Sequence, residues 1–184
     1  LFIGGGTPSL FSAQAMEQIL SAVRMLLPLD HGAEITLEAN PGTVEADKFA
    51  GFRDAGVNRL SLGIQSFNDN HLKALGRIHD ASQARRAVEI AQQNFANINL
   101  DLMYGLPQQT QAEAAQDVHA ALEFAPQHLS CYNLTLEPNT LFHRYPPALP
   151  DDDLCSAMQQ DIEQMLSTHG YQHYETSAFA QPKK

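Results

Sequence analysis

The 184-residue sequence predicts an α/β fold in which parallel strands form a TIM-type (β/α) barrel. Strand-like segments alternate with helical segments along the chain, which is typical of βα units and of a parallel sheet. Nearly every strand-like segment also ends in a polar or glycine-rich cluster. A barrel gathers all such ends at one mouth, whereas a doubly wound sheet binds ligands at its switch point. The many strand ends that carry polar or glycine-rich clusters therefore favour the barrel.

Five segments have the short apolar or alternating character of strands. The first four are followed by the clusters GGGTPS, EANPG, GIQS and DLMYGLP. We expect these strands to lie parallel and in sequence order, in a sheet that is open on one side. The five segments are residues 1–3, 33–39, 58–64, 98–104 and 128–136.

Helical stripes lie between these strands, because apolar residues recur there at spacings of three and four. Ser12 is the expected N-cap of the first helix, and Gly56 fits the left-handed position after the second. The last helix follows the acidic, proline-rich link YPPALPDDD. The first stripe consists of Met16, Ile19, Leu20, Val23, Leu26 and Leu27, and later stripes span 49–55, 84–91, 114–122 and 154–166.

Composition narrows the class of protein. Hydrophobic residues make up 43% of the chain, enough for the core of one domain spanning residues 1–184. A formal net charge of -10 disfavours binding to nucleic acid or to an anionic membrane surface. No apolar run approaches the roughly 20 residues of a membrane span, and no secretory leader is visible, so we expect a cytoplasmic protein. Cys131 and Cys155 lack metal-site spacing and are expected to be reduced thiols.

Three consecutive glycines, Gly4 to Gly6, follow the first strand. A dinucleotide-binding fingerprint would need a further glycine where Ser9 stands, and a phosphate-binding P-loop would need a lysine, but none occurs before Lys48. A tight turn that requires positive φ remains one interpretation. The other is that a ligand lies against this backbone.

Polar side chains near the other strand ends favour a ligand. Glu38, Gln65, Arg77 and Asp101 lie at or just past the carboxyl ends of expected strands, so they would converge over the glycines. Each alone could be an ordinary surface residue. Together they suit a small zwitterion, because backbone groups, a guanidinium and carboxylates match an amino group, a carboxylate and sugar hydroxyls.

Six segments resemble the radical S-adenosylmethionine proteins of the oxygen-independent coproporphyrinogen III oxidase type, in order and over nearly the whole chain. EANPG and HYETSAFA are more similar to the haem-chaperone (HemW) branch of that group. The resemblance implies a six-stranded partial barrel that holds a 4Fe-4S cluster and S-adenosylmethionine at its mouth. The segments are GGGTPS, LEANPGT, LSLGIQSFN, LKALGRIHD, INLDLMYGLPQQT and YQHYETSAFA.

The resemblance also implies which residues bind S-adenosylmethionine. Arg77 would suit the methionine carboxylate, and Asp101 or Glu38 the ribose hydroxyls, a division that rests on their chemistry. Thr135 corresponds to a backbone contact of the family, although NLTLEP departs from the family's pattern there. The full set of implied cofactor contacts is Gly5, Gly6, Thr7, Glu38, Gln65, Arg77, Asp101 and Thr135.

The cluster-binding Cys-x-x-x-Cys-x-x-Cys loop of this family is absent from the sequence. We expect a fragment that lacks the first barrel strand and the cluster loop upstream of Leu1, and in which about the last 15 residues begin a C-terminal extension. No catalytic residue or metal ligand is expected in it. Cluster and haem binding would belong to the full-length protein, and the fragment alone would be inactive.

Three functions remain open. The first is a haem chaperone that binds haem or porphyrin and delivers it to respiratory proteins, with membrane association only peripheral and through partners. The second is an oxygen-independent coproporphyrinogen III oxidase, so whether the whole protein is an enzyme stays undecided. The third is a non-catalytic barrel-like binding domain, which would be indicated if Glu38 and Asp101 pointed away from each other.

Overall fold

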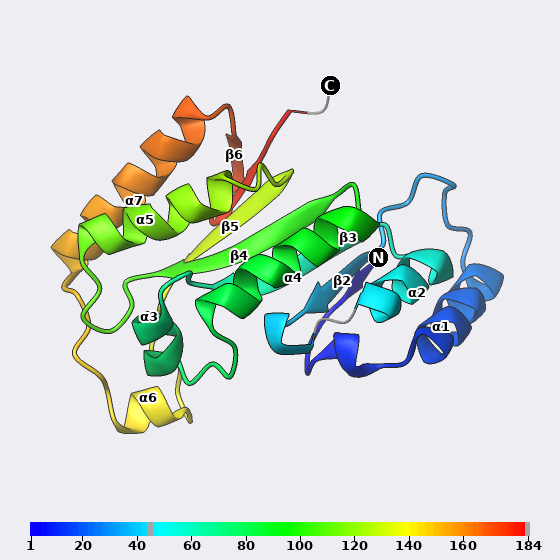
Figure 1. The fold of residues 1–184 in the computed structure, drawn as a ribbon, viewed down its shortest axis with the longest axis horizontal. Coiled ribbons are helices and arrows are strands. Elements are labelled where there is room, and N and C mark those ends of the chain that lie inside the picture. The colour runs from blue at the N-terminus through cyan, green and yellow to red at the C-terminus, as the bar shows by residue number, and fades with distance from the viewer. Residues whose placement is uncertain (44–45, 183–184) are drawn as a thin grey trace.

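A computed structural model describes residues 1–43 and 46–182 and shows one curled sheet with helices along one face (Figure 1). The order β1-β2-β3-β4-β5-β7-β6 begins with five parallel strands in sequence order. This confirms the predicted parallel arrangement and excludes a sheet that doubles back. The strands are β1 (Phe2–Ile3), β2 (Thr36–Ala39), β3 (Arg59–Gln65), β4 (Ile98–Tyr104), β5 (His128–Asn133), β6 (Gln172–Glu175) and β7 (Ala178–Ala180).

The C-terminal segment adds a hairpin that sequence analysis did not assign to the sheet. Strand β7 pairs antiparallel with β5, and β6 pairs antiparallel with β7. The sheet is therefore parallel only from β1 to β5. Strand β5 is also shorter than predicted, ending at Asn133 rather than at residue 136, because the neighbouring strand β4 ends opposite it at Tyr104.

Five longer helices follow the strands as predicted, and the structure adds two short ones. Ser12 Oγ accepts a hydrogen bond from Ala15 N at 3.1 Å, which confirms it as N-cap, and Gly56 has the expected positive φ of 106°. The short helices have too few residues for a periodic pattern. The helices are α1 (Ala13–Leu26), α2 (Ala46–Ala55), α3 (Asp69–Ala74), α4 (Ala81–Asn94), α5 (Gln111–Leu122), α6 (Leu141–Arg144) and α7 (Asp152–Thr168), with 3₁₀ turns η1 (Pro8–Leu10) and η2 (Pro41–Thr43).

The core lies between the sheet and the helices. Alternate residues of β3 and β4 point toward the helices and are fully buried, and Phe49 and Phe52 of α2 fill the same layer. The apolar stripe of α1 extends beyond the buried face, since Leu26 and Leu27 are exposed. The buried strand residues are Leu60, Leu62, Ile64, Ile98, Leu100 and Leu102.

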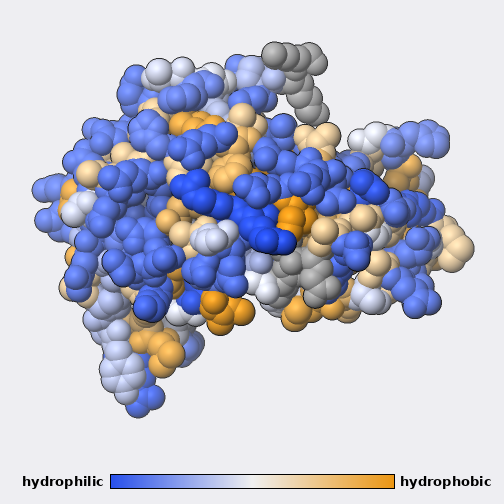
Figure 2. Space-filling view, viewed as in Figure 1, coloured by the Kyte–Doolittle hydropathy of each residue, from blue (hydrophilic) through white to orange (hydrophobic). Residues whose placement is uncertain are grey.

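The other set of alternate residues points to the concave face of the sheet, away from the helices. These positions carry polar groups, among them Ser61 on β3 and Asn99 and Asp101 on β4. Hydrophilic residues predominate on the helix-covered face (Figure 2). Among the helices that the structure describes, none is long and apolar enough to cross a membrane.

Replacing a core leucine tests this layering. Leu100→Ala removes a side chain with 0% exposure and should lower the free energy of unfolding by about 2–5 kcal/mol, the cost of a core cavity. Leu26→Ala, at a position with 80% exposure, is the matched control and should change it by less than about 0.5 kcal/mol. Urea denaturation measures both, and equal losses would contradict the assigned core.

Candidate functional site

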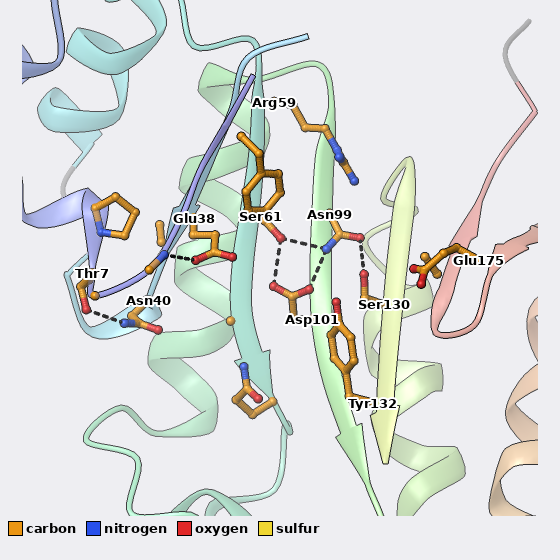
Figure 3. A pocket seen from close by; sticks show the side chains of 18 of the residues that line it. Thr7, Glu38, Asn40, Arg59, Ser61, Asn99, Asp101, Ser130, Tyr132 and Glu175 are labelled. Carbon is orange, nitrogen blue, oxygen red and sulfur yellow. Dashed lines mark hydrogen bonds between the residues drawn. The ribbon is translucent and has the colours of Figure 1, made fainter. Parts of the chain in front are cut away.

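The concave face of the sheet forms a cavity of about 540 Å³ (Figure 3). Side chains from β2, β3, β4 and β5 project into it, the loop after β1 closes one side, and β6 lies on the other. These groups meet because every second residue of a strand faces the same side of a sheet. The cavity is therefore a direct product of the parallel pairing.

The glycine run forms one edge of this cavity. Gly5 has a φ of 106°, so part of the run is needed for the turn itself. A Cβ atom at Gly4 would lie 2.8 Å from Glu38 Oε2, whereas at Gly5 or Gly6 it would meet nothing within 4 Å. Gly4 thus leaves room for the Glu38 carboxylate, which accepts a hydrogen bond from Gly5 N at 3.3 Å. Gly5 and Gly6 leave open backbone beside the cavity.

The carboxyl end of β3 supplies a second edge. Gln65, its last residue, has a φ of 69° at the point where the register between β3 and β4 shifts. A Cβ atom at Gly63 would lie 3.0 Å from Gln65 Nε2 and 3.2 Å from Asn40 Oδ1. The missing side chain at Gly63 therefore leaves room for both amides, and Asn40 Nδ2 also donates to Thr7 Oγ1 at 3.3 Å.

Asp101 is held at the floor of the cavity by hydrogen bonds from neighbouring strands (Figure 3). Ser61 Oγ donates to its Oδ2 at 2.9 Å, and Asn99 Nδ2 donates to its Oδ1 at 2.8 Å. The register explains this, because Ser61 pairs with Asn99, and Asp101 pairs with Ser130. Asp101 lies in the middle of β4 rather than at its carboxyl end as expected, and it reaches the cavity because its position faces inward.

Burial makes this carboxyl group hard to ionise. Desolvation raises the pKa of Asp101 from 3.8 to about 6, and the charge of Glu38 adds to the rise. The hydrogen bonds from Ser61 and Asn99 act in the opposite direction. Asp101 is thus poised to change its charge near neutral pH.

Seven of the eight predicted site residues line this single cavity. Thr135 does not: it lies past the end of β5, is exposed, and donates to Glu137 Oε1 at 2.9 Å. The expected strand would have carried it further along the sheet, and its role as a backbone contact stays a prediction. The seven residues are Gly5, Gly6, Thr7, Glu38, Gln65, Arg77 and Asp101.

Several cavity residues were missed by sequence analysis. Ser61, Asn99, Ser130 and Tyr132 all line the cavity but are not among the predicted contacts. Their signal was present in the sequence as polar residues alternating with apolar ones inside strands. This alternation predicts strands, but it does not show which residues meet, because that depends on the pairing of segments distant in sequence.

Neither cysteine is suited to hold a metal. Cys131 lies in the middle of β5 with 6% exposure, and burial raises the pKa of its thiol to about 12. Cys155 lies on α7, and its pKa is also raised by burial. Within residues 1–43 and 46–182, no group of three His, Cys, Asp or Glu side chains could hold a metal ion.

Together these features define a partial (β/α)-barrel protein with a glycine-edged polar cavity on its concave face. Residues 1–121 match the family described as the radical SAM superfamily, and the chain belongs to that superfamily.

Curated relatives specify the comparison further. The chain is 55% identical to the heme chaperone HemW of Escherichia coli over 99% of its length, and 52% identical to that of Haemophilus influenzae over 98%. These matches cover 48% and 47% of the relatives, so the chain spans about half of their length. Among solved structures it is similar to the coproporphyrinogen III oxidase HemN of Escherichia coli, with a TM-score of 0.89 and 29% identity over 100% of this chain and 43% of that one.

The raised pKa of Asp101 has a consequence for stability. The unfolded carboxyl ionises near its ordinary pKa of 3.8 and the folded one near 6, so stability falls as pH rises between these values. Asp101→Asn removes this cost. The free energy of unfolding of the variant, relative to that of the unsubstituted protein, should be roughly 2–3 kcal/mol higher at pH 7.5 than at pH 4. Urea denaturation at both pH values measures it, with the exposed Asp54→Asn as control. If the difference in unfolding free energy between Asp101→Asn and the unsubstituted protein did not change with pH, the raised pKa of the buried Asp101 would be contradicted.

Proposed function

We propose that the chain is the barrel core of a cytoplasmic radical S-adenosylmethionine haem chaperone of the HemW type. The observation that carries this proposal is the contrast between two proteins of one organism. Identity is 55% to the heme chaperone HemW of Escherichia coli but 29% to its coproporphyrinogen III oxidase HemN. Both share the fold, so the difference in identity favours the chaperone over the oxidase.

The cavity fits S-adenosylmethionine in its chemistry. Gly5 and Gly6 present backbone with open space beside it, where the methionine amino group would lie. Arg77 at the rim would bind the methionine carboxylate, since a guanidinium donates two parallel hydrogen bonds to such a group. Thr7 lies on the same edge and adds a hydroxyl group.

The strands beside the glycine edge suit the nucleoside. Glu38 and Asp101 line the same cavity and are acceptors for ribose hydroxyls when ionised. Gln65 adds an amide that donates and accepts. Because Glu38 and Asp101 face one space, the alternative of a binding domain whose glycines serve only a turn is disfavoured.

We place the 4Fe-4S cluster of such a protein on residues outside this chain. The burial and raised pKa of Cys131 and the position of Cys155 on a helix support this placement. In the loaded protein the cluster would supply the electron that cleaves the sulfonium carbon–sulfur bond. We therefore expect residues 1–184 alone to be inactive in that reaction.

Haem, or a related porphyrin, is the proposed cargo of the whole protein, and haem-accepting respiratory proteins are its proposed partners. The full-length protein should shift the Soret band of added haem and should release no carbon dioxide from coproporphyrinogen III when supplied with S-adenosylmethionine and a reductant. The release assay is run beside an oxidase that performs the decarboxylation. Decarboxylation without haem binding would favour the oxidase instead.

Arg77→Ala tests the cofactor site in the complete protein. Loss of a charge-assisted partner for the methionine carboxylate should weaken S-adenosylmethionine binding by about 1.5–3 kcal/mol in calorimetric titration. Arg86→Ala, which removes an exposed guanidinium on α4, is the matched control and should leave the dissociation constant unchanged. An unchanged constant for Arg77→Ala would mean that Arg77 is only a surface cation.

A further inference from the structure

Beneath the proposed cofactor contacts lies a set of uncharged polar side chains on three adjacent strands. Ser61, Asn99 and Ser130 are 5%, 3% and 6% exposed. Polar groups buried this deeply are costly unless they are hydrogen-bonded. Their hydrogen bonds run to one another and to Asp101, so the four residues form one network (Figure 3).

The network fixes the orientation of each of its members. Ser130 Oγ donates to Asn99 Oδ1 at 3.1 Å, which leaves the Asn99 amide nitrogen facing Ser61 and Asp101. Asn99 Nδ2 donates to Ser61 Oγ at 2.9 Å and to Asp101 Oδ1 at 2.8 Å. Ser61 then has its own proton free to donate to Asp101 Oδ2 at 2.9 Å. Each oxygen of the Asp101 carboxylate therefore receives one donor.

The surroundings otherwise oppose a negative charge on Asp101. Desolvation is the largest such effect, and Glu38 adds repulsion. Two donors from Ser61 and Asn99 are the main local compensation. The titratable or charged groups facing this region are Glu38 on β2, Arg59 on β3, Arg77 after α3, Tyr132 on β5, and Tyr174 and Glu175 on β6.

We propose that Asn99 and Ser61 are positioning residues that keep Asp101 ionised and aimed into the cavity, so that it can accept hydrogen bonds from ligand hydroxyl groups. This inference rests on the proposed function in one respect, because it takes S-adenosylmethionine as the ligand. The effect on the charge of Asp101 is independent of any ligand. The two parts can therefore be tested separately.

The ligand-free part is tested by following the Asp101 carboxyl carbon by NMR between pH 4 and 9 in the protein without added S-adenosylmethionine. Asn99→Leu keeps a side chain of similar shape but removes the donor, and should move the titration midpoint upward by about one pH unit or more. Asn97→Leu, the same substitution one residue before β4, is the matched control, since Asn97 donates to Glu34 and not to Asp101.

The ligand-dependent part is tested by calorimetric titration of the complete protein with S-adenosylmethionine across the same pH range. Asn99→Leu should weaken binding at pH 7 by about twofold for a one-unit rise in the midpoint and by about tenfold for a two-unit rise, and binding should recover to within about twofold of the unsubstituted protein at pH 9. A purely structural defect would not recover at high pH. Ser61→Ala, a smaller change, should act in the same direction if Asn99→Leu does not fold.

An Asp101 midpoint that stays the same in both Asn99→Leu and Ser61→Ala would overturn the inference. A midpoint that rises, while Asp101→Asn binds S-adenosylmethionine as tightly as the unsubstituted protein, would uphold the network. That second result would remove Asp101 from the proposed cofactor site.

Discussion

The parallel pairing of β1 to β5 is the constraint on which the rest of the structure depends. It directs one set of alternate side chains to the helices and the other to the concave face. Helices cover only the first face, so the second is free to carry polar groups. The core and the cavity are therefore two consequences of one backbone arrangement, and a register slip by one residue would exchange them.

Keeping a carboxylate on that concave face is costly. Asp101 sits in the middle of a strand, where desolvation opposes its charge, and its neighbours offset part of that cost by hydrogen bonds. A purely structural sheet would gain by placing an apolar residue there. A desolvated carboxylate at the centre of the cavity is consistent with the proposed binding site, because perturbed ionisable groups in a cavity are typical of functional sites.

The glycine edge and the carboxylates of Glu38 and Asp101 line the same cavity. Gly4 gives space to the Glu38 side chain, while Gly5 and Gly6 leave backbone open to the cavity. The chain belongs to the radical SAM superfamily, and the proposed ligand, S-adenosylmethionine, combines an amino acid with a nucleoside. The chain spans about half the length of its HemW relatives.

The sequence by itself determined the order of strands and helices, the glycine turn and seven of the residues that line the cavity. Those features are local, because a strand period, a cap such as Ser12 or a turn glycine depends on residues close in the chain. Only the tertiary structure decided that Ser61, Asn99 and Ser130 join Asp101, that Thr135 lies outside the cavity, and that the C-terminal hairpin extends the sheet. These outcomes depend on strand register and on where each neighbouring strand ends, which are set by contacts between segments distant in sequence.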